Sequence, residues 1–240
     1  MAPINYNTTS VDKILYGSTE IDSLYRGVAE AYSAFSIATW SYVDSSTSTN
    51  GTIRIPTSAA IGDLCVLYDV TVNASRTTPT GFTTILSTNS VFENVFSYKV
   101  LVSGDPGAFL SGSSGVNAYT VKIMMVFRPS TAVTITTGTL QSTIETSGNP
   151  AAITVNTSAI TESGVAIGVA KIYNSSAINA SGTGNWNATS VYHRSTNSTP
   201  ARAAMFYKLQ NAGSLTNPTL DIPDQGSYNT LLGIYFEGTG

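Results

Sequence analysis

The chain has 240 residues, of which 42% are hydrophobic, so it can bury a core either as one large β-domain or as two small ones. Only 10% of its residues are charged, the net charge is −3, and the eleven Lys and Arg are scattered, which argues against a nucleic-acid partner. β-Branched and aromatic residues recur throughout the chain, which excludes the disordered class of low hydrophobicity and high net charge.

The N-terminal segment, residues 1–35, contains a ten-residue repeat. Lys13-Ile-Leu-Tyr-Gly-Ser-Thr-Glu20 is followed by Ser23-Leu-Tyr-Arg-Gly-Val-Ala-Glu30, so that the glycines and glutamates correspond. Short strands around a glycine predict a hairpin or a meander. So small a unit cannot bury enough apolar surface alone, and we expect it to lie either on the main body as an edge hairpin or on another chain as an attachment arm. The candidate attachment residues are Ile14, Tyr16, Gly17, Glu20, Leu24, Tyr25, Gly27 and Glu30.

The start of the chain has neither a positive n-region nor an apolar h-region, and no apolar run approaches the ~18 residues that cross a bilayer. We therefore expect a protein made in the cytoplasm without a signal peptide, and no membrane partner. The single cysteine, Cys65, excludes an intrachain disulfide and is interpreted as a small buried hydrophobe.

Residues 36–240 are predicted to form an all-β domain. Short segments rich in Val, Ile, Tyr and Thr are bounded by Gly, Pro, Asn and Ser, and no helical periodicity is sustained after residue 35. The predicted strands are Ser36–Val43, Thr52–Ile55, Asp63–Val72, Phe82–Leu86, Phe96–Val102, Tyr119–Arg128, Val133–Thr136, Ala152–Val155, Gly164–Tyr173, Thr189–His193, Arg202–Leu209 and Asn229–Phe236. So many strands favour an antiparallel β-sandwich, jelly-roll-like, of two sheets.

The body contains an approximate internal pseudo-repeat. When it is cut near Pro150, the halves 36–150 and 151–240 run through similar elements, such as Tyr98-Lys99 in the first and Tyr207-Lys208 in the second. The offset drifts between about 102 and 109 residues. Two small domains are one interpretation, and the one we favour is a single sandwich in which the halves interleave.

The repeat between Lys13 and Glu30 resembles an N-terminal pattern that is common in tail-associated and other structural proteins of tailed bacteriophages. Residues 50–236 are similar to a β-sandwich module frequent in phage virion proteins. Its landmarks here are Gly62-Asp63-Leu64, Pro79-Thr80-Gly81-Phe82-Thr83, Tyr98-Lys99-Val100 and Gly104-Asp105-Pro106. These motifs are landmarks of the fold, so the resemblance implies a virion protein and carries no catalytic assignment.

The residues that catalysis or metal binding needs are sparse. The only histidine, His193, ends a predicted strand, and no His-x-x-x-His, Cys-x-x-Cys or Asp-x-Asp-x-Asp pattern is present. The carboxylates are dispersed without a pairing signature. Calcium in the loops 103–107 or 223–226 is an alternative to two ordinary turns. We expect no enzyme activity, no cofactor and no dedicated metal site.

Aromatic and amide side chains gather in loop-like contexts of the second half. Flat rings beside amides can stack on sugar rings and bind their hydroxyls, so Trp186, Tyr192, His193 and Tyr228 are candidates for contact with a surface glycan. The alternative is that Trp186 and Tyr192 fill the core.

The resulting hypothesis is a non-enzymatic structural protein of a bacteriophage virion, either a capsid decoration or a tail or fibre component. Residues 1–35 dock it onto capsid or tail proteins and the sandwich of residues 36–240 is exposed. We expect a homo-oligomer, for which a trimer would be unsurprising. The alternative is a host-surface carbohydrate-binding adhesion module, and the second alternative is a small hydrolase.

Overall fold

The computed structural model describes most of the body of the chain and short parts of its N-terminal segment. The described residues are 15–16, 19–20, 23–26, 29–33, 38–49, 51–72, 76–88, 92–111, 120–145, 153–156, 162–173, 186, 191–194, 201–210, 217–220 and 229–239. In the segments up to residue 33, in 191–194 and at several strand ends the description covers the backbone alone.

The chain divides into two compact units, Met1–Ser36 and Ile37–Gly240. The smaller unit contains β1 (Leu15–Tyr16), β2 (Thr19–Glu20), β3 (Ser23–Arg26) and β4 (Ala29–Ser33). Every regular element of the described residues is a strand, so this part of the chain offers no helix that could span a membrane.

Sheet 1 has the antiparallel order β5-β11-β7-β9-β8. Its strands are β5 (Trp40–Ser48), β7 (Leu64–Val72), β8 (Thr83–Thr88), β9 (Phe92–Val100) and β11 (Val121–Pro129). The central strands β7 and β11 are near-continuous apolar runs. Such runs are typical of strands that are buried on both faces.

Sheet 2 has the antiparallel order β12-β19-β15-β17-β16, with β13 pairing farther along the same edge of β19 as β12. Its strands are β12 (Thr134–Thr137), β13 (Gln141–Glu145), β15 (Gly164–Tyr173), β16 (Val191–Arg194), β17 (Ala201–Gln210) and β19 (Asn229–Thr239).

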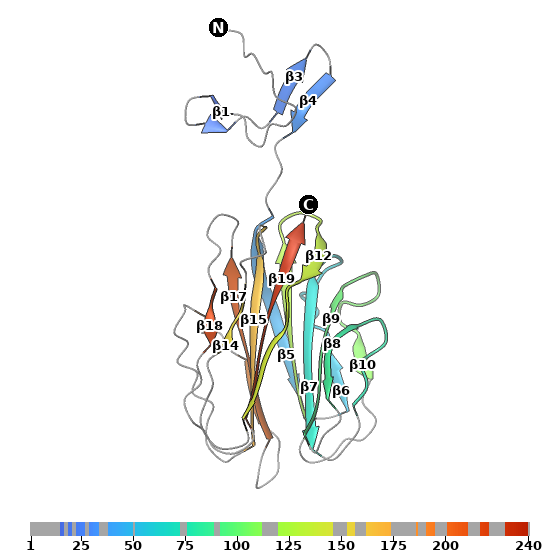
Figure 1. Ribbon diagram of the computed structural model, residues 1–240. Coiled ribbons are helices and arrows are strands. Elements are labelled where there is room, and N and C mark those ends of the chain that lie inside the picture. Colours follow the sequence, from blue (N-terminus) through green and yellow to red (C-terminus); the bar gives the residue numbers. More distant parts are fainter. Residues whose placement is uncertain are drawn as a thin grey trace. The chain divides into compact units, whose positions relative to one another are not determined.

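Two short ribbons complete the unit. β6 (Thr52–Arg54) pairs with β10 (Phe109–Ser111), and β14 (Ile153–Thr154) pairs with β18 (Thr219–Leu220). Figure 1 shows β6 and β10 beside sheet 1, on the right, and β14 and β18 beside sheet 2, on the left. Each ribbon therefore lies on the outer side of its own sheet.

The main core lies between the two sheets, because side chains of alternate residues from both sheets form one buried cluster. Its members are Trp40, Leu64, Val66, Tyr68, Val70, Phe96, Val121, Ile123, Met125, Phe127, Val165, Ile167, Val169, Ala203, Met205, Tyr207, Leu232, Ile234 and Phe236. Rings meet across the gap: Tyr42 stacks on Tyr207 with centroids 4.9 Å apart, and Tyr98 meets Phe236 edge-on at 5.2 Å.

The outer faces are covered as well. On sheet 1, Cys65 and Leu67 pack with Ile53 and Ile55 of the β6 segment in a second cluster that includes Phe82. On sheet 2 a third cluster contains Ile153, Ala170, Ala204, Phe206 and Leu231.

The two sheets have the same topology. β5, β7, β8, β9 and β11 of sheet 1 correspond in order and pairing to β12 with β13, β15, β16, β17 and β19 of sheet 2. The register agrees residue by residue: Leu64 pairs with Val100 and Phe127, and the equivalent Val165 pairs with Leu209 and Phe236.

The short ribbons repeat the correspondence, since Ile55 N donates to Ala108 O at 2.9 Å and Val155 N donates to Pro218 O at 2.9 Å. The unit is thus built from two copies of one strand arrangement.

The predicted fold class, all-β with antiparallel sheets, is confirmed. Each of the twelve predicted strands has a counterpart, although β5 begins at Trp40 rather than at Ser36 and β9 at Phe92 rather than at Phe96. The body strands β10, β13 and β18 were missed, because two to five residues give too short an alternation to detect.

The two halves share strands at one place only among the described residues: β12 and β13, which precede Pro150, pair with β19 in the sheet that otherwise contains strands of the second half. The change of sheet falls between Pro129 and Thr134 rather than near Pro150. The reason is that β12 and β13 hydrogen-bond to the edge of β19, as β5 does to the edge of β11.

Candidate functional site

The N-terminal unit consists of two hairpins with equivalent register. Leu15 pairs with Glu20 and Tyr16 with Thr19, and ten residues later Tyr25 pairs with Glu30 and Arg26 with Ala29. Two residues separate the paired strands in each repeat, and glycine is the first of them. Glycine in that place suits a two-residue II′ hairpin loop.

Of the predicted attachment residues, Tyr16, Glu20, Leu24, Tyr25 and Glu30 lie in these strands, where the backbone is described. Ile14, Gly17 and Gly27 lie outside the described residues. The structure therefore brings the repeated tyrosine and glutamate positions into two similar hairpins, and their contacts with any partner stay a prediction.

The loops on the outer side of sheet 1 are fastened by ion pairs. Arg128 Nε donates to Asp63 Oδ1 at 2.8 Å, and its Nη2 donates both to Asp63 Oδ2 at 2.8 Å and to Ser58 O at 3.0 Å. The hydrogen bond to Asp63 raises the pKa of Arg128. This bidentate pair ties the loop before β7 to the end of β11.

Asp105 lies in loop 103–107, one of the two candidate calcium sites, and its carboxylate accepts hydrogen bonds from protein donors. Its Oδ1 accepts from Lys99 Nζ at 2.7 Å and its Oδ2 accepts from Val102 N at 2.7 Å. Desolvation raises the pKa of Asp105, but these hydrogen bonds outweigh it and the net pKa is lowered. These hydrogen bonds are those of an ordinary turn held in place by its own residues. The second candidate calcium loop, 223–226, lies outside the described residues.

A buried ionic cluster lies at one end of sheet 1. Asp69 on β7 pairs with Lys122 on β11, and Arg76 Nε lies 3.4 Å from Asp69 Oδ1, with both carboxylate and cations almost fully buried. Arg76 Nη2 also donates to Thr120 Oγ1 at 2.7 Å. Burial lowers the pKa of Lys122 and of Arg76, and the charge of Asp69 opposes both shifts.

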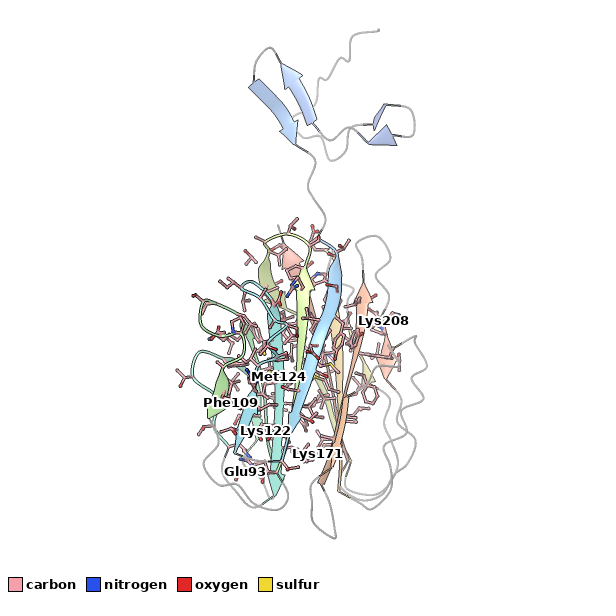
Figure 2. All side chains as sticks on the ribbon, turned by 180° about the vertical axis from the view of Figure 1, so that it is seen from behind. Glu93, Phe109, Lys122, Met124, Lys171 and Lys208 are labelled. Carbon is pink, nitrogen blue, oxygen red and sulfur yellow. The ribbon has the colours of Figure 1, made fainter. Side chains whose placement is uncertain are left out.

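Figure 2 shows Lys122 and Glu93 at the same end of the body. The equivalent of Asp69 and Lys122 in sheet 2 is an apolar pair, Ala170 and Leu231, which are opposite each other in register. The sequence carried a signal for this cluster, because Asp69 and Lys122 are opposite charges inside two apolar strands. We interpret this ionic cluster as a structural one that holds the segment containing Arg76 against sheet 1.

Lys171 is a charged residue in the core between the sheets. On β15 it continues the inward row of Val165, Ile167 and Val169, and it occupies the position that Val70 has in sheet 1. Only 3% of the residue is exposed, and burial lowers its pKa to about 8. Figure 2 shows it near the end of the sheets that also holds Lys122.

Of the four predicted glycan-contact residues, the structure describes the side chain of Trp186 alone. Trp186 is half-buried, packs against the outer clusters of sheet 2, and its Nε1 donates to Thr219 O at 3.0 Å. Its ring covers part of the outer face of sheet 2 and is not in the core between the sheets. Tyr192 and His193 lie in β16, opposite Ala204 and Ala203.

The side chains of Tyr192 and His193, and the whole of Tyr228, are outside the described residues. Their proposed contact with a glycan stays a prediction.

One exposed pair on sheet 1 was not anticipated from the sequence. Phe109 is 68% exposed, and the Arg54 guanidinium lies over its ring, 5.5 Å from the centroid. Arg54 Nε donates to Gly107 O at 3.0 Å, which holds the guanidinium in place. Ile61 and Val102 are the other exposed large hydrophobic residues in the described part of the chain. An aromatic and an arginine in this setting are typical of interface hot spots.

Within the described residues, no three His, Cys, Asp or Glu side chains gather so that they could hold a metal ion. The chain matches no protein-family model, no curated protein and no solved structure.

Proposed function

We propose that this chain is a non-enzymatic structural protein of a bacteriophage virion. Its N-terminal unit docks the protein onto capsid or tail proteins, and its two-sheet unit is exposed on the particle. The role is either capsid decoration or a component of the tail or fibre.

The observation that carries the proposal is the N-terminal unit itself. Two equivalent hairpins, too small to bury a core of their own, form a unit that is compact and distinct from the 37–240 unit. Such an element gains stability when it packs on another protein, as a docking arm does. The resemblance of the Lys13–Glu30 repeat to virion proteins points the same way.

The body suits exposure on a particle. The chain is poor in charge and rich in Ser, Thr and Asn, and three of the described carboxylates, Asp63, Asp69 and Asp105, are each engaged by a cation. Ion pairs of this kind fasten loops and strands. Because these carboxylates are already held by protein cations, they are poorly placed to exchange a proton with a substrate, as acid–base catalysis requires.

For the fold, we propose a β-sandwich, because the buried side chains of both sheets form one core. The strand order does not support the jelly-roll arrangement, since the described strands from β5 to β11, apart from the β6–β10 ribbon, form one sheet and those from β12 to β19, apart from the β14–β18 ribbon, form the other. The sandwich is better described as two copies of one five-stranded arrangement packed face to face.

The alternative is a carbohydrate-binding adhesion module. Trp186 is half-buried against the outer clusters of sheet 2, and the part of its ring that is exposed is the surface such a module would use. We favour the structural role because the N-terminal hairpins support it.

Deletion of residues 1–36 from the gene in the phage genome tests the docking role. Quantitative mass spectrometry of purified particles should show loss of the truncated protein from the particle, while the protein accumulates folded in the lysate. A matched control replaces Ser18, which lies in the sequence between β1 and β2, by Ala and should be incorporated normally. Normal incorporation of the truncated chain would contradict the docking role.

A further inference from the structure

One edge of strand β10 has no partner strand in the part of the chain that the structure describes. Among the described strands it pairs with β6 alone, with Phe109 opposite Arg54 and Leu110 opposite Ile53. Figure 1 shows β10 at the right-hand margin of the two-sheet unit, and Figure 2 shows Phe109 at that margin from behind.

The hydrogen bonds of the ribbon show which backbone groups face that edge. Because Ile55 N donates to Ala108 O, residue 108 forms a hydrogen-bonded pair with β6, and such pairs alternate along an antiparallel ladder. Leu110 therefore directs its N–H and C=O toward β6. Phe109 and Ser111 direct theirs toward the open edge.

The exposed pair beside this edge is not required by the fold, as the second half of the chain shows. At the positions equivalent to Arg54 and Phe109, the β14–β18 ribbon has Thr154 and Thr219, whose hydroxyls lie 3.1 Å apart. Two ribbons with the same pairing thus carry a small hydroxyl pair in one half and a large cation–aromatic pair in the other.

We propose that two copies of this chain associate by antiparallel pairing of β10 with β10 about a twofold axis that passes through Leu110. Phe109 then pairs with Ser111 of the second copy, and the four outward N–H and C=O groups of each copy are satisfied. The two ribbons form a continuous sheet in the order β6, β10, β10, β6.

The geometry is consistent with this register. A strand that pairs with its own copy about a twofold axis is self-complementary, as an isologous contact requires. Residues 109 and 111 are the ones whose backbone groups face the open edge, so they form the hydrogen-bonded pairs. The two Phe109 rings become diagonal neighbours on the exposed face, a separation of about 7–8 Å between backbone positions that aromatic side chains can bridge.

The strand order keeps the two Arg54 residues apart. Their backbone positions are separated by three strand spacings, about 14 Å, and each guanidinium lies over the Phe109 ring of its own copy. The whole chain carries 14 acidic against 11 basic residues, so the two copies have only a small net charge.

A second copy fits this surface better than a small ligand does. Sites for small ligands are concave, whereas Phe109 is 68% exposed on a two-stranded ribbon. An open strand edge offers backbone hydrogen bonds, which another strand satisfies in full. The contact is independent of the docking role of residues 1–36, so either can fail without the other.

Sedimentation velocity of the full chain, from low micromolar to several hundred micromolar, tests the proposal. The wild-type chain should show a concentration-dependent dimer. Phe109→Ser should raise the dimer dissociation constant at least about tenfold, because it removes a central aromatic contact. Ser111→Pro should do the same, because it removes a backbone donor that faces the open edge and leaves the pairing with β6 intact.

Matched controls come from the other half. Thr154→Ala and Thr219→Ala, at the positions equivalent to Arg54 and Phe109, should leave the dissociation constant within about twofold of the wild-type value. Unchanged thermal unfolding of diluted Phe109→Ser and Ser111→Pro would show that the monomer is intact. A wild-type chain that stays monomeric, or an oligomer unaffected by both substitutions, would overturn the proposal and assign this face to a different partner or to a glycan.

Discussion

Lys171 should destabilise the folded protein at neutral pH, and replacing it by Met should stabilise it. Its pKa falls from 10.5 in the unfolded chain to about 8 in the folded protein because of burial. Since one pKa unit corresponds to ~1.4 kcal/mol, keeping the ammonium charged in the core costs about 3 kcal/mol below pH 8. Met has a similar length and no charge, so Lys171→Met should recover most of that amount.

The sign of the pH dependence follows from proton binding. Between the folded and unfolded pKa values the unfolded chain binds more protons, so the stability of the wild-type protein rises with pH across this window. The advantage of Lys171→Met should therefore be about 3 kcal/mol near pH 7 and shrink to about 1 kcal/mol near pH 10.

Urea unfolding of both proteins at several pH values measures this difference directly. Val70→Met, at the equivalent position of sheet 1, is the matched control, because it changes packing without removing a charge and its effect should not vary with pH. A wild-type protein that is more stable than Lys171→Met at pH 7, or a difference that is constant with pH, would refute the reasoning.

Three further outcomes are expected. Asp69→Ala should lower the free energy of unfolding by about 3–5 kcal/mol, because it leaves buried cations uncompensated, and adding Lys122→Leu, the residue type found in sheet 2, should restore part of that loss. A double-mutant cycle by urea unfolding that shows no recovery would contradict the pairing. Gly164→Ala should destabilise by about 3 kcal/mol in the same assay, since its Cβ would meet the carbonyl oxygen of Phe236 on the neighbouring strand β19, and a wild-type-like midpoint would show that the two strands can move apart to make room. Burial raises the pKa of the Cys65 thiol, so a thiol reagent near pH 8 should label Cys65 only in denaturant, and rapid labelling of the native protein would be inconsistent with its place in the core.

Much of the sheet framework could be predicted from the sequence, because its signals are local. Gly164–Tyr173 was predicted with the bounds that β15 has, since a long apolar run between polar turns leaves little choice. The landmarks Tyr98-Lys99 and Tyr207-Lys208 fall at equivalent register positions in β9 and β17.

The pairing of strands within each sheet could not be predicted from such local signals. Which strand lies beside which depends on packing between segments far apart in sequence, and β12 and β13 carry no local signal that they belong to β19. The short strand β10 and its exposed Phe109 were missed for a related reason. Three residues give no period, and a single Phe in a sequence looks the same whether it is buried or exposed.

The account's central claim is that this chain is a virion structural protein held by its N-terminal unit. Cryo-electron microscopy of particles of the encoding phage, compared with particles that lack the gene, tests it most directly. The account predicts extra density on the capsid or tail that fits the two-sheet unit, with residues 1–36 in contact with the particle. Particles that contain no copy of the protein, or that hold it through the two-sheet unit with residues 1–36 free, would contradict it.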